Sequence, residues 1–220
     1  MKELQKSNHL ERKILFKKVD LNRSTIPALF LDRDGVIIED KHYLSDINNV
    51  KLCPGISDLL RNVCLRGWHI VVVTNQSGIS RKFFTWEDYE KVTNRIIELL
   101  GSPPLLSAIY ANGHSVDASK NSWRKPNPNM IFEAAKELRI DLPKSIMIGD
   151  RLSDIKCGTS AGLGKVFHVL SGHGEEERAL VEEYKKDFEN HLKIQNRKTE
   201  FMFLDSLLDF PLELIENLIS

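Results

Sequence analysis

Two aspartates stand one residue apart directly after a run of apolar residues. The stretch from Ala28 to Asp40 reads A-L-F-L-D-R-D-G-V-I-I-E-D, which places Asp32 and Asp34 after A-L-F-L and just before Gly35. The apolar run is typical of a buried strand, and negative charges at the mouth of such a strand are costly unless something compensates them. Because an aspartate can act as a covalent nucleophile and form an aspartyl-phosphate, this pair is the first candidate for catalysis.

The elements that would position this pair alternate between strand and helix. Apolar runs bounded by Gly, Pro, Asn or Asp predict buried strands, and 3.6-residue periodicity predicts helices between them. The predicted strands are 28–31, 69–73, 107–111, 145–148, 165–170 and 201–204, and the predicted helices are 55–66, 85–101, 127–139 and 206–218. This order predicts an α/β fold, a three-layer Rossmann-like parallel sheet with helices on both faces. The short segments between the motifs leave no room for a large cap domain.

More polar side chains follow other predicted strands. In a parallel sheet the carboxyl ends of the strands meet at one edge, where ligands bind. These residues are Asp32, Arg33 and Asp34 after the first strand, Thr74, Asn75, Gln76 and Ser77 after the second, Arg124 and Lys125 before the third helix, and Asp150, Arg151 and Asp154 after the fourth strand.

The residue types in this set suit phosphoryl transfer. Carboxylates gathered from several strand ends would raise each other's pKa values unless a cation lay between them. Mg2+ prefers oxygen ligands and retains several waters, which leaves room for a phosphate oxygen. Thr74 adds a hydroxyl and Lys125 a compact positive charge. Catalysis of phosphoryl transfer consists mainly of such positioning and charge stabilisation.

Each motif alone has a plainer interpretation. D-R-D-G could be a turn in which aspartates bond their own backbone, T-N-Q-S a strand-to-helix turn, and Lys125 a solvated surface charge. In G-D-R-L-S-D, Ser153 or Asp154 could simply cap the next helix. Phosphoryl transfer is favoured because the motifs occur in order and each lies at the same end of a successive strand.

The two ends of the chain differ from its centre in composition. We expect an N-terminal extension over 1–25, polar with a local excess of basic residues, and one phosphatase-like domain over 26–220. Within that domain, 171–200 is heavily charged and predicts an inserted exposed helix and loop.

Composition excludes several classes of partner. Lys plus Arg and Asp plus Glu both number 31, so no overall field attracts nucleic acid, and we expect no nucleic-acid partner. The three cysteines are far apart in the sequence, and no apolar run resembles a signal peptide or a membrane span. We therefore expect a cytoplasmic monomer with no membrane partner, acting on a small phosphorylated substrate.

The motifs also carry a resemblance. The stretches F-L-D-R-D-G-V-I, V-V-V-T-N-Q-S-G-I, R-K-P and M-I-G-D-R-L-S-D match, in order, the four motifs of haloacid-dehalogenase (HAD) superfamily phosphatases. Within that superfamily the residues of these motifs are similar to those of the D-glycero-D-manno-heptose 1,7-bisphosphate phosphatases and their histidinol-phosphatase relatives. The resemblance covers 28–170, and F-M-F-L-D-S-L-L-D-F-P resembles the closing segment of the family.

The resemblance implies roles for individual residues. Asp32 would attack phosphorus, and Asp34 would protonate the leaving alkoxide and then help to activate water. Mg2+ would be held by Asp32, the main-chain carbonyl of Asp34 and Asp150. Thr74 and Asn75 would orient the phosphoryl group, and Lys125 would neutralise its charge. The remaining substrate-binding candidates that we expect are Asp40, His42, Tyr43, Gln76, Ser77, Arg124 and Arg151.

One departure from the family concerns a loop. Related heptose-bisphosphate phosphatases carry C-x-H and C-x-C zinc ligands before R-K-P, whereas this chain has Asn112-Gly113-His114 and Asn121-Ser122-Trp123. A tetrahedral zinc site cannot form from His114 alone, so we expect no structural zinc. The hypothesis is that the loop is ordered by other means, such as packing of Trp123. Ile38, where relatives carry Asn, is a second departure.

Four functions fit these observations. The resemblance favours a Mg2+-dependent phosphatase that removes the 7-phosphate of heptose 1,7-bisphosphate through an aspartyl-phosphate. The alternatives are a histidinol-phosphate phosphatase, a nucleic-acid 3'-phosphatase recruited by the basic N-terminus, and a non-catalytic binding module of the same fold. The complete set of candidate catalytic residues speaks against the last.

Overall fold

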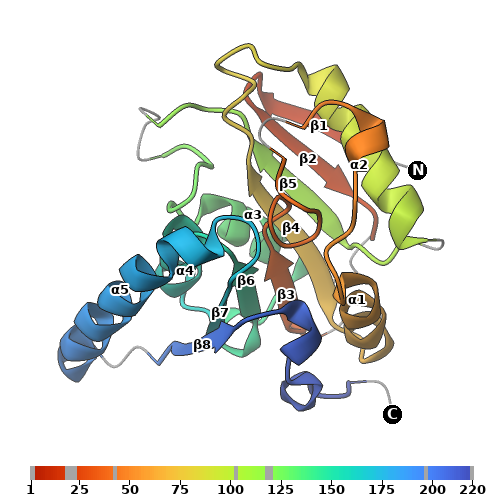
Figure 1. Cartoon of the computed structure of the whole chain (residues 1–220). Coiled ribbons are helices and arrows are strands. Elements are labelled where there is room, and N and C mark those ends of the chain that lie inside the picture. The colour runs from red at the N-terminus through yellow and green to blue at the C-terminus, as the bar shows by residue number, and fades with distance from the viewer. Residues whose placement is uncertain are drawn as a thin grey trace.

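An eight-stranded sheet runs through the middle of the molecule (Figure 1). The computed structural model describes residues 3–17, 24–41, 44–101, 104–116, 121–195 and 198–218. The strand order is β1-β2-β5-β4-β3-β6-β7-β8. The strands are β1 (Glu3–Asn8), β2 (Glu11–Leu15), β3 (Ala28–Leu31), β4 (His69–Asn75), β5 (Ala108–Asn112), β6 (Ile146–Gly149), β7 (Lys165–Val169) and β8 (Glu200–Leu204).

The six strands from β3 to β8 are parallel, which confirms the predicted α/β fold. From β3 the chain moves outward through β4 and β5, and it then crosses to β6 on the other side of β3. The carboxyl ends of β3, β4 and β6 therefore lie side by side. Ligands bind at this kind of reversal in a parallel sheet.

Helices cover both faces of the sheet (Figure 1). One core cluster joins α1 (Ile56–Leu65) and α2 (Trp86–Leu100) to one face, and a second joins α3 (Asn129–Leu138), α4 (Leu152–Ala161) and α5 (Gly174–Gln195) to the other. Apolar residues recur at helical spacing on the inner side of each helix; in α1 they are Ile56, Leu59, Leu60 and Val63.

The charged segment after β7 forms α5, as predicted. Three glutamates occupy the first turn of this helix, where acidic side chains interact favourably with the helix dipole. Its inner side is apolar: Val181 is fully buried, and Tyr184 and Phe188 contact Phe201 of β8. In the described part of the chain, no helix is long and apolar enough to cross a membrane.

The N-terminal residues form a hairpin, for which we predicted no strands. β1 pairs with β2, and β2 pairs antiparallel with β5 from Glu11 opposite Asn112 to Leu15 opposite Ala108. The polar sequence did not indicate that β2 is a buried strand. Its Glu11 and Lys13 are buried because each is paired with a residue distant in the chain. The sheet is thus parallel except at this edge.

The predicted closing helix over 206–218 was wrong. Two short 3-10 helices, Leu207–Asp209 and Leu212–Leu214, occupy this segment. Proline disfavours helical backbone in the residue before it, and Phe210, which precedes Pro211, is extended with ψ 124°. The apolar spacing reflects core packing instead, since Leu207, Phe210 and Ile215 are buried.

Candidate active site

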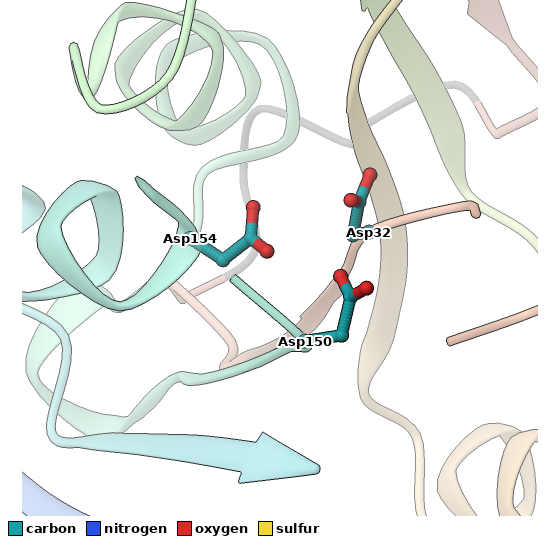
Figure 2. Close-up of side chains that lie close together, drawn as sticks. All are labelled: Asp32, Asp150 and Asp154. Atoms are coloured by element: carbon teal, nitrogen blue, oxygen red, sulfur yellow. The ribbon is translucent and has the colours of Figure 1, made fainter. Parts of the chain in front are cut away.

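Three aspartates converge at the reversal point of the sheet. Asp32 follows β3, Asp150 follows β6, and Asp154 lies in the first turn of α4. Figure 2 shows their carboxylates facing one another, and one oxygen of each lies within 4.8 Å of the other two. All three side chains are buried. The strand ends thus gather three negative charges around one point.

Lys125 provides the positive charge closest to these carboxylates. Its Nζ lies 2.9 Å from Asp32 Oδ1 and 2.6 Å from Asp154 Oδ1, and it donates to the carbonyl of Val73 at 2.8 Å. The side chain is almost completely buried. Although burial opposes the charged form, Asp154 and Asp32 raise the pKa of Lys125 above its usual value. Lys125 is therefore a fixed cation.

The charge around this point remains negative. Burial raises the pKa of Asp150 to about 8, helped by Asp154 and Asp32. Burial likewise raises the pKa of Asp32 to about 6, although Lys125 lowers it. Asp150 Oδ1 is buried and has no hydrogen-bond partner among the described residues. A hard divalent cation fits this donor set, because it would use the orphaned oxygen and offset the repulsion.

The backbone closes tightly around Asp150. Gly35 has a φ of +83°, and a Cβ there would lie 2.5 Å from Asp150 Oδ2. Asp150 Oδ2 also accepts from the backbone N–H of His173 at 2.8 Å. A side chain at position 35 would be both strained and obstructed, so only glycine fits.

Asp34 lies in a separate network. Arg33 donates to both of its oxygens at 3.0 Å, and Gln76 Nε2 donates to Oδ2 at 2.8 Å. Gln76 Nε2 also reaches Thr74 Oγ1 at 2.8 Å, and Gln76 Oε1 accepts from Arg33 at 2.9 Å. The Asp34 carboxylate is held as an acceptor by three donated hydrogen bonds.

Asn75 holds the backbone of Lys125. Its Oδ1 accepts from the Lys125 N–H at 3.0 Å, and its Nδ2 donates to the Lys125 carbonyl at 3.1 Å. The end of β4 is thereby tied to the loop that carries Lys125. This pair of bonds fixes where the Lys125 side chain begins.

A cavity of about 420 Å³ opens above the aspartates. Most of the predicted substrate-binding residues line it, whereas the fully buried Thr74, Asp150 and Asp154 lie outside its lining. His42 and Tyr43 fall outside the described residues. The predicted residues that line the cavity are Asp32, Asp34, Asp40, Asn75, Gln76, Ser77, Arg124, Lys125 and Arg151.

Four arginines line the same cavity. Arg33 is bound to Asp34, and the other three are Arg81, Arg124 and Arg151. Burial lowers the pKa of Arg124, and the neighbouring charges of Arg81 and Arg151 lower it further. Guanidinium groups close enough to disfavour one another favour an anionic ligand between them.

His173 also lines the cavity, although we had not predicted it. Its Nε2 lies 2.9 Å from Asp40 Oδ2, and its Nδ1 lies 3.2 Å from Glu176. No local motif indicated His173, because it reaches the site only where the loop before α5 returns to Gly35. There Ser171 Oγ donates to the Gly35 carbonyl.

Arg81, which lines the cavity, was also missing from our predictions, and Arg33 and Asp154 had been placed at this edge of the sheet without a role in catalysis or binding. Asp154 had been considered only as a helix cap, and it does accept from the Arg151 N–H at 3.0 Å. Its other oxygen binds Lys125, as its place in G-D-R-L-S-D could have suggested. Arg33 is the middle residue of D-R-D, and its hydrogen bonds to Asp34 and Gln76 depend on the turn that follows β3.

Comparison with known proteins gives a matching family model and named relatives. The HAD-hydrolase-like family model matches residues 122–192. The D-glycero-beta-D-manno-heptose-1,7-bisphosphate 7-phosphatase of Mesorhizobium japonicum is 40% identical over 151 residues, which cover 66% of this chain and 70% of that protein. The Escherichia coli K12 protein of the same name is 36% identical over 155 residues, covering 67% and 81%.

The chain also shares its fold with solved structures. An HAD-like phosphatase from Mesorhizobium loti superposes with a TM-score of 0.69 at 33% identity, covering 74% of this chain and 81% of that one. The D,D-heptose 1,7-bisphosphate phosphatase of B. bronchiseptica, complexed with magnesium and phosphate, gives a TM-score of 0.67 at 23% identity. That match covers 83% of this chain and 94% of the other.

Proposed function

Because the chain belongs to the HAD-like phosphatase family and is a phosphoric monoester hydrolase, we propose that it removes the 7-phosphate of D-glycero-beta-D-manno-heptose 1,7-bisphosphate. The observation that carries this proposal is the buried triad of Asp32, Asp150 and Asp154 below a cavity lined with arginines. The names of the relatives supply the substrate.

Asp32 is the nucleophile in this proposal. Its Oδ1 accepts from Lys125 Nζ at 2.9 Å and from the Arg33 N–H at 2.7 Å, so we assign the attack to Oδ2. Attack on phosphorus forms the acyl phosphate bond and breaks the bond to the sugar oxygen. Lys125 stabilises the charge of the transferred group.

Asp34 moves the proton. The leaving alkoxide takes a proton from Asp34. Asp34 then accepts a proton from the water that attacks the aspartyl-phosphate, which releases inorganic phosphate and restores Asp32. The hydrogen bonds from Arg33 and Gln76 suit the second of these steps, when Asp34 is an acceptor. For the first step Asp34 must exchange one of these bonds for the substrate oxygen.

Asp32, Asp150 and the main-chain carbonyl of Asp34 would hold Mg2+. The bound ion would neutralise the carboxylates and polarise the phosphoryl group. The unpartnered Asp150 Oδ1 and the raised pKa values of Asp150 and Asp32 support this assignment. The B. bronchiseptica protein, whose structure contains magnesium, shares only the fold at 23% identity, so the argument rests on these carboxylates.

The arginines favour a bisphosphate over histidinol phosphate. A heptose bisphosphate carries a second phosphate away from the reacting one, and Arg81, Arg124 and Arg151 would bind it. Histidinol phosphate instead carries an ammonium group at its far end. That group would be repelled by the same three side chains.

Phosphate release with Mg2+ from a panel of substrates tests the proposal. The panel contains heptose 1,7-bisphosphate, other sugar phosphates, histidinol phosphate and a 3'-phosphorylated oligonucleotide. We expect the highest kcat/KM for heptose 1,7-bisphosphate, with heptose 1-phosphate as product. A preference for histidinol phosphate or the oligonucleotide, or no turnover of any sugar phosphate, would contradict the proposal.

A further inference from the structure

The loop between β5 and Lys125 carries Arg124 into the cavity, and the N-terminal hairpin holds this loop. The cysteines of the chain are Cys53, Cys64 and Cys157, so no thiolate is available in the loop to bind a structural metal. Other contacts must therefore order the loop, and the role inferred for them in substrate binding rests on the proposed function.

Glu11 of β2 is a buried carboxylate directed at the loop. Glu11 is only 8% exposed, and its Oε1 accepts from the backbone N–H of Trp123 at 3.1 Å. The same oxygen lies 3.5 Å from His114 Nε2. A buried carboxylate is costly unless it is paired, and these two partners lie at opposite ends of the loop. Glu11 therefore ties the two ends together.

The rest of the hairpin supports this contact. The carbonyl of Leu10 accepts from the Gly113 N–H at 2.7 Å, at the start of the loop. The carbonyl of His9 accepts from Trp86 Nε1 at 2.8 Å, which joins the hairpin turn to α2. On the other side of the sheet Lys13 forms ion pairs with Glu137 and Glu133 of α3. The hairpin is thus anchored on both faces before it reaches the loop.

The loop in turn orients Arg124. The guanidinium of Arg124 donates to the carbonyl of His114 at 2.9 Å. Trp123, whose N–H binds Glu11, is the preceding residue, and its ring packs edge-on against Tyr110 at 5.5 Å. Lys125 is fixed independently by Asn75, so the contact with Glu11 bears mainly on Arg124.

We propose that Glu11 is a positioning residue for substrate binding: it holds His114 and Trp123 in place so that Arg124 faces the anionic group of the substrate remote from the reaction. Glu11 touches neither the substrate nor the reacting atoms. Its loss should weaken binding and leave the chemical step intact.

Steady-state kinetics of Glu11→Ala and Glu11→Gln test this proposal. Loss of the hydrogen bond in Glu11→Ala should raise KM for heptose 1,7-bisphosphate about tenfold, with kcat unchanged within about twofold. Glu11→Gln keeps an acceptor for the Trp123 N–H, so its KM should lie close to that of the wild type. If Glu11→Ala does not fold, Glu11→Asp, whose shorter side chain cannot span the same distance, should show the same rise in KM.

A double-mutant cycle separates positioning from general damage to the fold. Arg124→Ala alone should raise KM, and adding Glu11→Ala should raise it no further, because both changes remove the same interaction. Lys13→Met is the matched control: it removes a buried charge from the same strand whose ion-pair partners lie on α3 and not on the loop, and it should lower stability without raising KM. Additive effects of Glu11→Ala and Arg124→Ala, or an equal rise in KM for Lys13→Met, would overturn the proposal.

Amide hydrogen exchange gives a readout that does not depend on activity. The Trp123 amide should exchange faster in Glu11→Ala than in the wild type, while the Gly113 amide, bound to the Leu10 carbonyl, should change less. Unchanged exchange at Trp123 would overturn the positioning role. A wild-type protein inactive on heptose 1,7-bisphosphate would instead refute the proposed substrate, and faster exchange at Trp123 would still support the contact.

Discussion

Lys125 and Asp154 form the contact in the site that is least expected from sequence. Asp154 uses one oxygen for Lys125, at 2.6 Å, and the other to accept from the Arg151 N–H at the start of α4. One side chain thus caps a helix and holds the ammonium group of Lys125. The two tasks can be separated by substitution, because only the hold on Lys125 requires a negative charge.

Asp154→Asn should separate these tasks. Asparagine still caps the helix, so the melting temperature should change little. Loss of the charge should weaken the hold on Lys125 and on the bound cation, and raise the Mg2+ concentration for half-maximal activity about tenfold or more. Activity measured across a Mg2+ titration, with thermal unfolding followed by circular dichroism, checks both effects. An unchanged Mg2+ requirement would show that Asp154 acts only as a cap.

At the scale of elements, β4 contributes at both of its ends. Its carboxyl end supplies Thr74 and Asn75 to the site. Its amino end begins at His69, whose Nδ1 lies 3.1 Å from Ser107 Oγ in the interior. Burial, with a smaller effect of Lys17, lowers the pKa of His69 from its usual 6.5 to about 4. The strand that supports the site is therefore sensitive to acid at its far end.

This sensitivity predicts how stability depends on pH. Between pH 6.5 and 4 the unfolded chain protonates this histidine while the folded chain does not, so the free energy of unfolding should fall as the pH is lowered through that window. His69 should contribute about 1–2 kcal/mol to the fall in the free energy of unfolding between pH 7 and pH 5. Urea unfolding at pH 7 and pH 5 should show a smaller decrease for His69→Gln than for the wild type. Equal decreases would mean that His69 does not titrate in this way.

At the scale of the whole molecule, the local sequence predicted the central strands of the sheet. The edge strand β2, the segment around His173 and the segment after β8 could not be predicted in this way. The strands that carry Asp32, Thr74 and Asp150 could be predicted because each is a short apolar run followed by polar residues. Their common edge then follows from the parallel sheet. The proposed roles of these residues remain predictions that rest on the family resemblance.

These three parts could not be predicted, because most of the contacts that determine them join residues far apart in the chain. Glu11 and Lys13 made β2 look like an exposed segment, and only their partners at Trp123 and Glu137 explain their burial. His173 comes from a charged segment that contains no motif. The apolar spacing after β8 resembled a helix, but Pro211 prevents one. In each case a contact with a distant segment, or a single backbone restriction, outweighed the local pattern.

Turnover by Asp32→Asn is the most direct test of the account, because every role proposed for the site depends on Asp32 as nucleophile. The variant keeps the size and most of the hydrogen bonds of the side chain, so it should fold with the circular dichroism spectrum of the wild type. We expect its rate of phosphate release from heptose 1,7-bisphosphate with Mg2+ to fall by at least about a thousandfold. A folded Asp32→Asn protein that retains a rate close to that of the wild type would contradict the account.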